Sequence, residues 1–89
     1  MIPQYDTHRE FERQYKRAPS AIRNRLWERL EMLADNPDNP LLRNHKLNPP
    51  WEGYHSINVT GDWRLVYKQL SGNLFYLRAV GTHHQLFGS

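Results

Sequence analysis

Residues 51–80 read WEGYHSINVTGDWRLVYKQLSGNLFYLRAV, and this stretch decides the fold. Three segments rich in aromatic and β-branched residues lie within it, at 51–59, 63–68 and 74–80. Such a composition favours β-strands. The segments are separated by Thr60-Gly61-Asp62 and by Ser71-Gly72-Asn73, which are typical of tight turns. Because short turns join antiparallel strands, the stretch predicts a three-stranded meander.

The residues that precede the meander have helical patterning. Thr7 followed by Glu10 matches a capping box, which predicts a helix that begins there. Pro19-Ser20 predicts the start of a second helix, since proline is tolerated in a first turn. Apolar residues then recur about one turn apart on one face of this helix, at Ile22, Leu26, Leu30 and Leu33. Pro37 disfavours helical geometry in its predecessor, so the second helix should end near Asp35-Asn36.

The remaining segments complete the predicted fold. Residues 2–5 carry Pro3 and fit an edge strand at best, and residues 37–50, rich in Pro and Asn, predict a loop. The two helices are close in sequence and predict an antiparallel hairpin. The fold class is therefore α+β, in the order β-α-α-β-β-β, with the helix hairpin packed on one face of a small, mostly antiparallel sheet. Residues 1–89 are short enough for a single domain, and residues 81–89 fit a last turn or a brief helix.

Composition and charge narrow the classes of function. No apolar run approaches the length of a membrane span, and the N-terminus lacks the apolar stretch of a signal peptide, so we expect a cytoplasmic protein without membrane contact. The absence of cysteine excludes disulfides and thiolate chemistry. Twelve Lys and Arg against nine Asp and Glu give a net charge of +3. A basic surface favours a polyanionic partner, and nucleic acid is the first candidate. An acidic protein would be attracted by the same positive charge.

The histidines are the first candidates for a functional site, and there are five: His8, His45, His55, His83 and His84. A metal site has little support, because there is no H-E-x-x-H motif and no cysteine. His83 and His84 are adjacent, so on a strand they would point to opposite sides. We therefore expect neither a metal nor a cofactor.

General acid–base chemistry fits these histidines better, because imidazole titrates near neutral pH. Cleavage of RNA by its own ribose 2′-hydroxyl needs a base for the hydroxyl proton, an acid for the leaving 5′-oxygen and a cation for the phosphate charge. His45, Asp62, Arg64 and His83 could supply these roles if the fold brings them together. Composition alone does not show that these four side chains converge. The competing interpretation is that each of them is an ordinary, solvent-exposed surface residue.

Several separate motifs resemble one known family. They are His45-Lys46-Leu47, Trp51-Glu52-Gly53-Tyr54, DWRLVY at 62–67 and GTHHQLFG at 81–88. In this order they resemble the YafQ-like branch of the RelE/ParE toxin superfamily, closely over the C-terminal half and only in pattern over the helix pair. The resemblance implies a RelE-like fold, in agreement with the patterning above. It also implies a toxin of a type II toxin–antitoxin system that cleaves mRNA on the ribosome, without a metal, and is inhibited by a cognate antitoxin.

The resemblance also implies roles for particular residues. His45 corresponds to the loop histidine of the family's site, His83 to its C-terminal histidine and Asp62 to its acidic residue. Arg64 corresponds to a strand arginine of the wider superfamily, which implies phosphate stabilisation. His45 and His83 would be the base–acid pair, in either assignment, and Asp62 would orient a histidine.

Three further residues are carried over as substrate-binding candidates. Phe87 corresponds to a terminal aromatic residue that helps to hold a base. Lys46 is a possible second cation, and Trp63 is a neighbour of the site with a more structural character.

Two positions depart from the family pattern. Asn58 stands where the YafQ-like site has another histidine, so a proton-transfer role is lost there. Ala79 stands where that branch usually has an arginine, and Arg78 is one residue away. On a regular strand Arg78 and His83 would face opposite sides, whereas a β-bulge would change this.

Two other functions remain open at this stage. One is a non-enzymatic, ParE-like inhibitor of DNA gyrase on the same fold, since fold alone does not determine function. The other is an RNA-binding module without turnover. His45, Asp62 and His83 favour the ribonuclease, because neither alternative needs acid–base groups.

Overall fold

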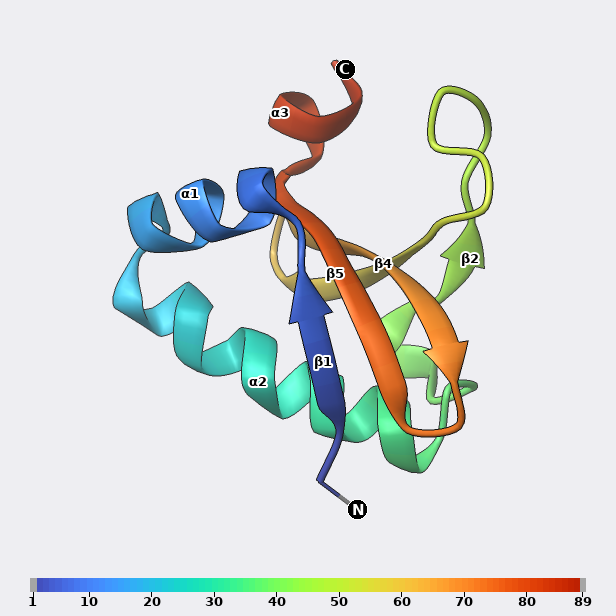
Figure 1. Cartoon of the computed structure of the whole chain (residues 1–89). Helices are drawn as coiled ribbons and strands as arrows, with labels where there is room; N and C mark the ends of the chain where they lie inside the picture. Colours follow the sequence, from blue (N-terminus) through green and yellow to red (C-terminus); the bar gives the residue numbers. More distant parts are fainter. Residues whose placement is uncertain (1, 89) are drawn as a thin grey trace.

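The computed structural model describes residues 2–88 and contains one five-stranded sheet in the order β1-β5-β4-β3-β2 (Figure 1). Its strands are β1 (Gln4–Thr7), β2 (His45–Lys46), β3 (His55–Thr60), β4 (Trp63–Ser71) and β5 (Leu74–Thr82). β3, β4 and β5 form the predicted antiparallel meander, but β3 begins at His55, and residues 51–54, which were predicted to belong to it, form a turn. β1 pairs with β5 in parallel at one edge, so the N-terminal edge strand is confirmed. β2 pairs with β3 at the other edge, inside the segment that was predicted to be only a loop.

The helices α1 (Arg9–Arg17) and α2 (Ser20–Asp35) cover one face of the sheet. Figure 1 shows them diverging from the turn that joins them. α1 packs against β5, and α2 packs against β3. The predicted start and end of α2 are confirmed. The predicted start of α1 is wrong: Thr7 belongs to β1, and His8 caps the helix by accepting the N–H of Glu10 at its Nδ1, at 2.9 Å. Pairing of Thr7 with Leu77 holds it in the strand, and its hydroxyl instead donates to Glu12.

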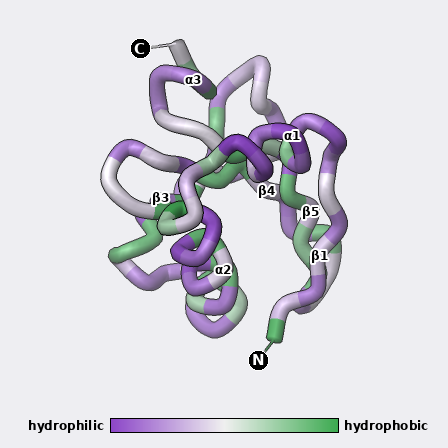
Figure 2. The backbone as a smooth tube through the Cα atoms, turned by 90° about the vertical axis from the view of Figure 1, so that its left-hand side faces the viewer, coloured by the Kyte–Doolittle hydropathy of each residue, from purple (hydrophilic) through white to green (hydrophobic). Residues whose placement is uncertain are grey.

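The hydrophobic core lies between these helices and the sheet. α2 contributes the apolar stripe predicted from the sequence, and all four of its residues are buried. The strands contribute fully buried side chains that include Ile57, Leu65 and Leu77. Figure 2 shows that hydrophobic segments follow the strands, whereas α1 is largely hydrophilic. α1 contributes the buried Phe11 to the core, and polar contacts also attach it to β5, one of which is the Gln14 side chain that accepts the Val80 N–H at 2.9 Å.

The C-terminal segment forms α3 (His83–Phe87), which confirms the prediction of a brief helix after the last strand. Thr82 and Gln85 form a capping box at its start. Gly81 allows α3 to fold back closely against β5, because a Cβ there would lie 3.0 Å from Gln85 Oε1 and 3.3 Å from carbons of Leu86. A side chain at this position would therefore press on Gln85 and Leu86 of α3.

Candidate active site

His45 is held by the segment that connects α2 to β3. The short 3₁₀ helix η1 (Pro40–Leu42) anchors this segment through the fully buried Leu42. Arg43 follows in the left-handed conformation, with φ 48°, and its carbonyl turns toward the His45 ring. The distance from His45 Nδ1 to that carbonyl oxygen is 2.8 Å. Because a carbonyl only accepts, Nδ1 carries the proton, and Nε2 of the neutral ring is left with its lone pair.

Arg64 is fixed at the start of β4 by one edge of its guanidinium. Nη1 donates to Asn58 Oδ1 at 2.7 Å and to the carbonyls of Gly61 and Trp63 at 3.0 and 3.2 Å. Asn58 is the direct cross-strand partner of Arg64 on β3. Within residues 2–88, the hydrogen bonds of this guanidinium all use Nη1, so Nη2 and Nε remain for a ligand.

His83 is placed by the junction of β5 and α3. Its backbone N–H donates to the Asp62 carbonyl at 2.8 Å, which ties the first turn of α3 to the β3–β4 turn. Its ring contacts Phe87 edge-on, with 5.0 Å between centroids. Phe87 in turn contacts Trp51 edge-on at 6.2 Å. A row of aromatic rings therefore runs outward from His83.

These side chains meet in one cavity of about 330 Å³ on the sheet face opposite the helices. It is lined by Arg43, His45, Leu47, Ser56, Arg64, His83 and Phe87. The cavity exists because residues with small side chains lie between the residues with long side chains. Ala79 and Gly81 on β5 are the cross-strand partners of Val66 and Arg64, and Ser56 is the partner of His45. Of the seven predicted site residues, four line this cavity: His45, Arg64, His83 and Phe87.

The structure does not bring Lys46 and Trp63 to this cavity. Lys46 pairs with His55, whose ring lines a different cavity on the helix side of the sheet, and paired residues share a face. Burial lowers the pKa of His55, and the nearby charge of Lys46 lowers it further. Trp63 packs against the core and lines a separate cavity with residues of α1. Lys46 and Trp63 are each adjacent in sequence to a residue that lines the cavity. Because successive side chains of a strand point to opposite faces, both of them lie on the other face of the sheet.

Asp62 reaches the site through its backbone. It lies in the turn between β3 and β4, where its side chain is exposed and its carbonyl accepts the His83 N–H. Its carboxylate is not part of the cavity lining.

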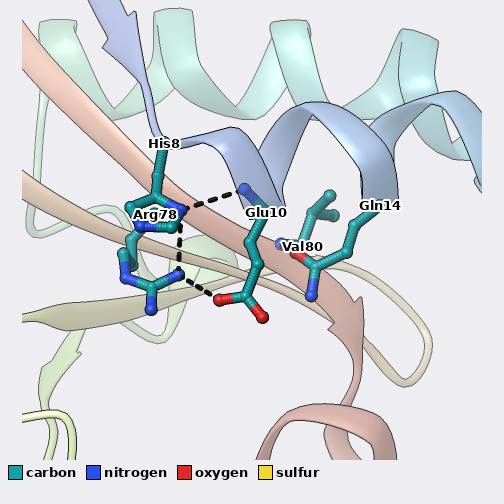
Figure 3. Close-up of polar contacts among 5 residues, drawn as sticks. All are labelled: His8, Glu10, Gln14, Arg78 and Val80. Carbon is teal, nitrogen blue, oxygen red and sulfur yellow. Dashed lines mark hydrogen bonds and ion pairs between the residues drawn. The ribbon is translucent and has the colours of Figure 1, made fainter.

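Arg78 lies in a β-bulge, which is the irregularity that the sequence analysis raised for this part of the strand. The pairing passes from Val66–Ala79 to Tyr67–Leu77, which leaves Arg78 without a cross-strand partner on β4. Its side chain forms an ion pair with Glu10 at 2.8 Å, near His8 (Figure 3), and its guanidinium lies 5.5 Å from the Trp51 ring centroid. The hydrogen bond and charge of Arg78 lower the pKa of Glu10. Arg78 therefore joins β5 to α1 and does not line the cavity.

Sequence reasoning missed three residues of the site. Asn58 was regarded as a lost histidine, yet its amide anchors Arg64. Arg43 sets the proton position of His45 through its carbonyl, and Ser56 forms part of the cavity lining. Period-two alternation along β3 places Ser56 and Asn58 on one face, and this was the available signal.

Comparison with known proteins identifies the family. The family model described as the bacterial toxin of type II toxin–antitoxin systems, YafQ, matches residues 3–88. The chain belongs to the YafQ toxin family. A curated Escherichia coli K12 relative, named mRNA interferase toxin YafQ, is 36% identical over 67 residues, which cover 73% of this chain and 72% of the relative.

Solved structures agree with this membership of the YafQ family. The crystal structure of YafQ from E. coli BL21(DE3) has a TM-score of 0.78 and 29% identity over 97% of this chain and 99% of that one. YafQ in the E. coli DinJ–YafQ toxin–antitoxin complex has a TM-score of 0.75 and 28% identity over 99% and 100%. The Staphylococcus aureus YoeB–YefM complex has a TM-score of 0.76 at 18% identity, over 93% and 99%, and shares the fold. The expected RelE-like fold and family are therefore confirmed.

Two further observations apply to residues 2–88 of this toxin. No three His, Cys, Asp or Glu side chains gather there in a way that could hold a metal ion. None of its helices has both the length and the apolar character that crossing a membrane requires.

Proposed function

We propose that this chain is an endoribonuclease that cleaves mRNA by attack of a ribose 2′-hydroxyl on the adjacent phosphate. One observation carries the proposal: two imidazoles and a guanidinium, from three separate segments, line a single cavity. These are the groups that the reaction needs, namely a base, an acid and a cation. The E. coli relatives named mRNA interferase toxins support the same substrate.

The hydrogen bond from His45 Nδ1 to the Arg43 carbonyl supports a role for His45 as the general base. Its Nδ1 proton is held by the Arg43 carbonyl, so Nε2 accepts the proton of the 2′-hydroxyl. The 2′-oxygen then forms a bond to phosphorus, while the bond from phosphorus to the 5′-oxygen of the next nucleotide breaks. The products are a 2′,3′-cyclic phosphate and a 5′-hydroxyl end.

Arg64 and His83 complete the reaction. The open edge of the Arg64 guanidinium hydrogen-bonds to the non-bridging phosphate oxygens, where charge accumulates in the transition state. His83, in its protonated form, donates a proton to the leaving 5′-oxygen. Asp62 orients His83 through its backbone, because its carbonyl accepts the His83 N–H at 2.8 Å. Phe87 offers its ring to a base beside the scissile phosphate.

The partners follow from the family. The solved E. coli complex pairs YafQ with the antitoxin DinJ, and we propose a cognate antitoxin for this chain as well. The substrate is mRNA on the ribosome, in the cytoplasm, where the basic surface of the toxin also contacts ribosomal RNA.

The test adds purified toxin to translating ribosomes and maps the ends of the message. Wild type should cut, whereas His45→Ala, Arg64→Ala and His83→Gln should each lose about 10²–10⁴-fold in rate. His84→Gln is the matched control, because His84 is adjacent to His83, exposed and outside the cavity. Uncut message with wild type, or equal cutting by His83→Gln, would refute the proposal. Inhibition of gyrase supercoiling with intact message would support the ParE-like alternative.

A further inference from the structure

One buried hydroxyl in this protein has no hydrogen-bond partner. Ser56 is fully buried in β3, and its Oγ is the one buried side-chain oxygen or nitrogen within residues 2–88 that makes no hydrogen bond. Burying a hydroxyl without a partner is unfavourable, and native structures rarely tolerate it without a reason. A fully buried strand position whose hydroxyl has no partner would be more stable with alanine.

The position of Ser56 suggests the reason. Ser56 lies between its cross-strand partners His45 on β2 and Val66 on β4, and it lines the cavity that contains His45, Arg64 and His83. Directly paired residues share a face of the sheet, so its side chain points to the cavity side. The Arg43 side chain, which lines the same cavity, is exposed and can change rotamer without disturbing the core or the His45 ring.

We propose that the Ser56 hydroxyl binds the RNA phosphate by donating a hydrogen bond to a non-bridging oxygen. A hydroxyl rotates freely about its C–O bond and can both donate and accept, so it suits an oxygen that becomes more negative during the reaction. Arg64 supplies the positive charge of this phosphate site, and Ser56 supplies a second donor from the floor of the cavity. This inference rests on the proposed ribonuclease function.

The proposal predicts opposite effects of Ser56→Ala on activity and on stability. Activity should fall about 10- to 100-fold in kcat/KM, the range expected for a hydrogen bond to a charged oxygen. The urea midpoint of unfolding should be unchanged or higher, because the variant removes an unsatisfied buried hydroxyl. A purely structural serine would give the opposite result, with a lower midpoint and activity that follows the folded fraction.

Two variants serve as controls in the ribosome cleavage assay. Ser56→Cys keeps nearly the same volume with a weak donor and should also lose activity, so it separates hydrogen bonding from space filling. Ser71→Ala makes the same chemical change at an exposed position of β4 outside the cavity and should cleave like wild type. A parallel binding measurement uses an RNA oligonucleotide with a 2′-deoxynucleotide at the scissile position, for which Ser56→Ala should bind more weakly.

The outcomes separate this inference from the proposed function. If wild type cuts and binds RNA while Ser56→Ala does so equally well, the role of Ser56 is overturned and the ribonuclease stands. If Ser56→Ala loses activity only together with its urea midpoint, the residue is structural and the inference is also overturned. If wild type neither cuts nor binds RNA, both proposals fail.

Discussion

Asn58 should control activity through Arg64, although it cannot transfer a proton. Its amide oxygen accepts from Arg64 Nη1 at 2.7 Å, and this is the one side-chain contact among the three hydrogen bonds that hold the guanidinium. In Asn58→Ala the guanidinium keeps its charge and its two backbone acceptors but loses its side-chain restraint. We therefore expect weakened transition-state stabilisation in a folded protein.

The magnitude follows from the bond that is lost. A hydrogen bond to a charged group contributes about 1.5–3 kcal/mol. Because two of the three bonds remain, we expect a loss of about 1–2 kcal/mol, which corresponds to roughly a 5- to 30-fold decrease in kcat/KM. Arg64→Ala, which removes the cation itself, should cost much more.

The assay is single-turnover cleavage of a ribosome-bound message by wild type, Asn58→Ala and Arg64→Ala. Asn24→Ala is the control, since Asn24 is exposed on α2 and should cleave like wild type. Full activity of Asn58→Ala would refute the reasoning that Asn58 positions Arg64. A loss as large as that of Arg64→Ala would also refute it, because Asn58 would then act directly.

Three further predictions concern the surroundings of the site. Because burial lowers the pKa of His55 below its usual 6.5, the unfolded chain binds more protons, and the free energy of unfolding should decrease as pH falls below about 6.5. Urea unfolding of His55→Gln should depend less steeply on pH in this range, and an unchanged slope would contradict the assignment. Arg78 lowers the pKa of Glu10, so this ion pair stabilises the fold above about pH 4.5 and the contribution is lost as the carboxylate becomes protonated. Glu10→Gln should therefore unfold about 0.2–1 kcal/mol more easily at pH 7, and a difference that persists at pH 2 would count against an ionic cause. Gly81→Ala should push the Gln85 and Leu86 side chains of α3 outward, because its Cβ would lie 3.0 Å from Gln85 Oε1 and 3.3 Å from carbons of Leu86. Cleavage should slow several-fold, since α3 carries His83 and a misplacement of about 1 Å can cost about 100-fold. Normal cleavage by this variant, at normal stability, would show that α3 accommodates the methyl group.

The parts of the fold that the sequence predicts are those with local signals. The meander follows from β-rich segments joined by tight turns, and α2 from its apolar stripe between Pro19 and Pro37. The start of α1 was misplaced because a non-local contact prevails: β5 pairs with Thr7 and holds it in β1. β2 was missed because two residues carry no strand pattern, and only pairing with β3 defines it.

The same distinction between local and non-local signals applies to the candidate site. Convergence of His45, Arg64 and His83 depends on three distant segments, so only the family resemblance suggested it. By contrast, strand alternation alone could have excluded Trp63 from the face that carries Arg64. The unsatisfied hydroxyl of Ser56 is a property of packing, and the sequence gives no sign of it.

The central claim is that the ribose 2′-hydroxyl performs the attack within this cavity. The most direct measurement compares two ribosome-bound messages that differ by one 2′-deoxynucleotide at the mapped cleavage position. The account predicts that the all-ribose message is cut, with a 2′,3′-cyclic phosphate and a 5′-hydroxyl at the break, and that the deoxy-substituted message stays intact there. Cutting of the deoxy-substituted message at that position would contradict it.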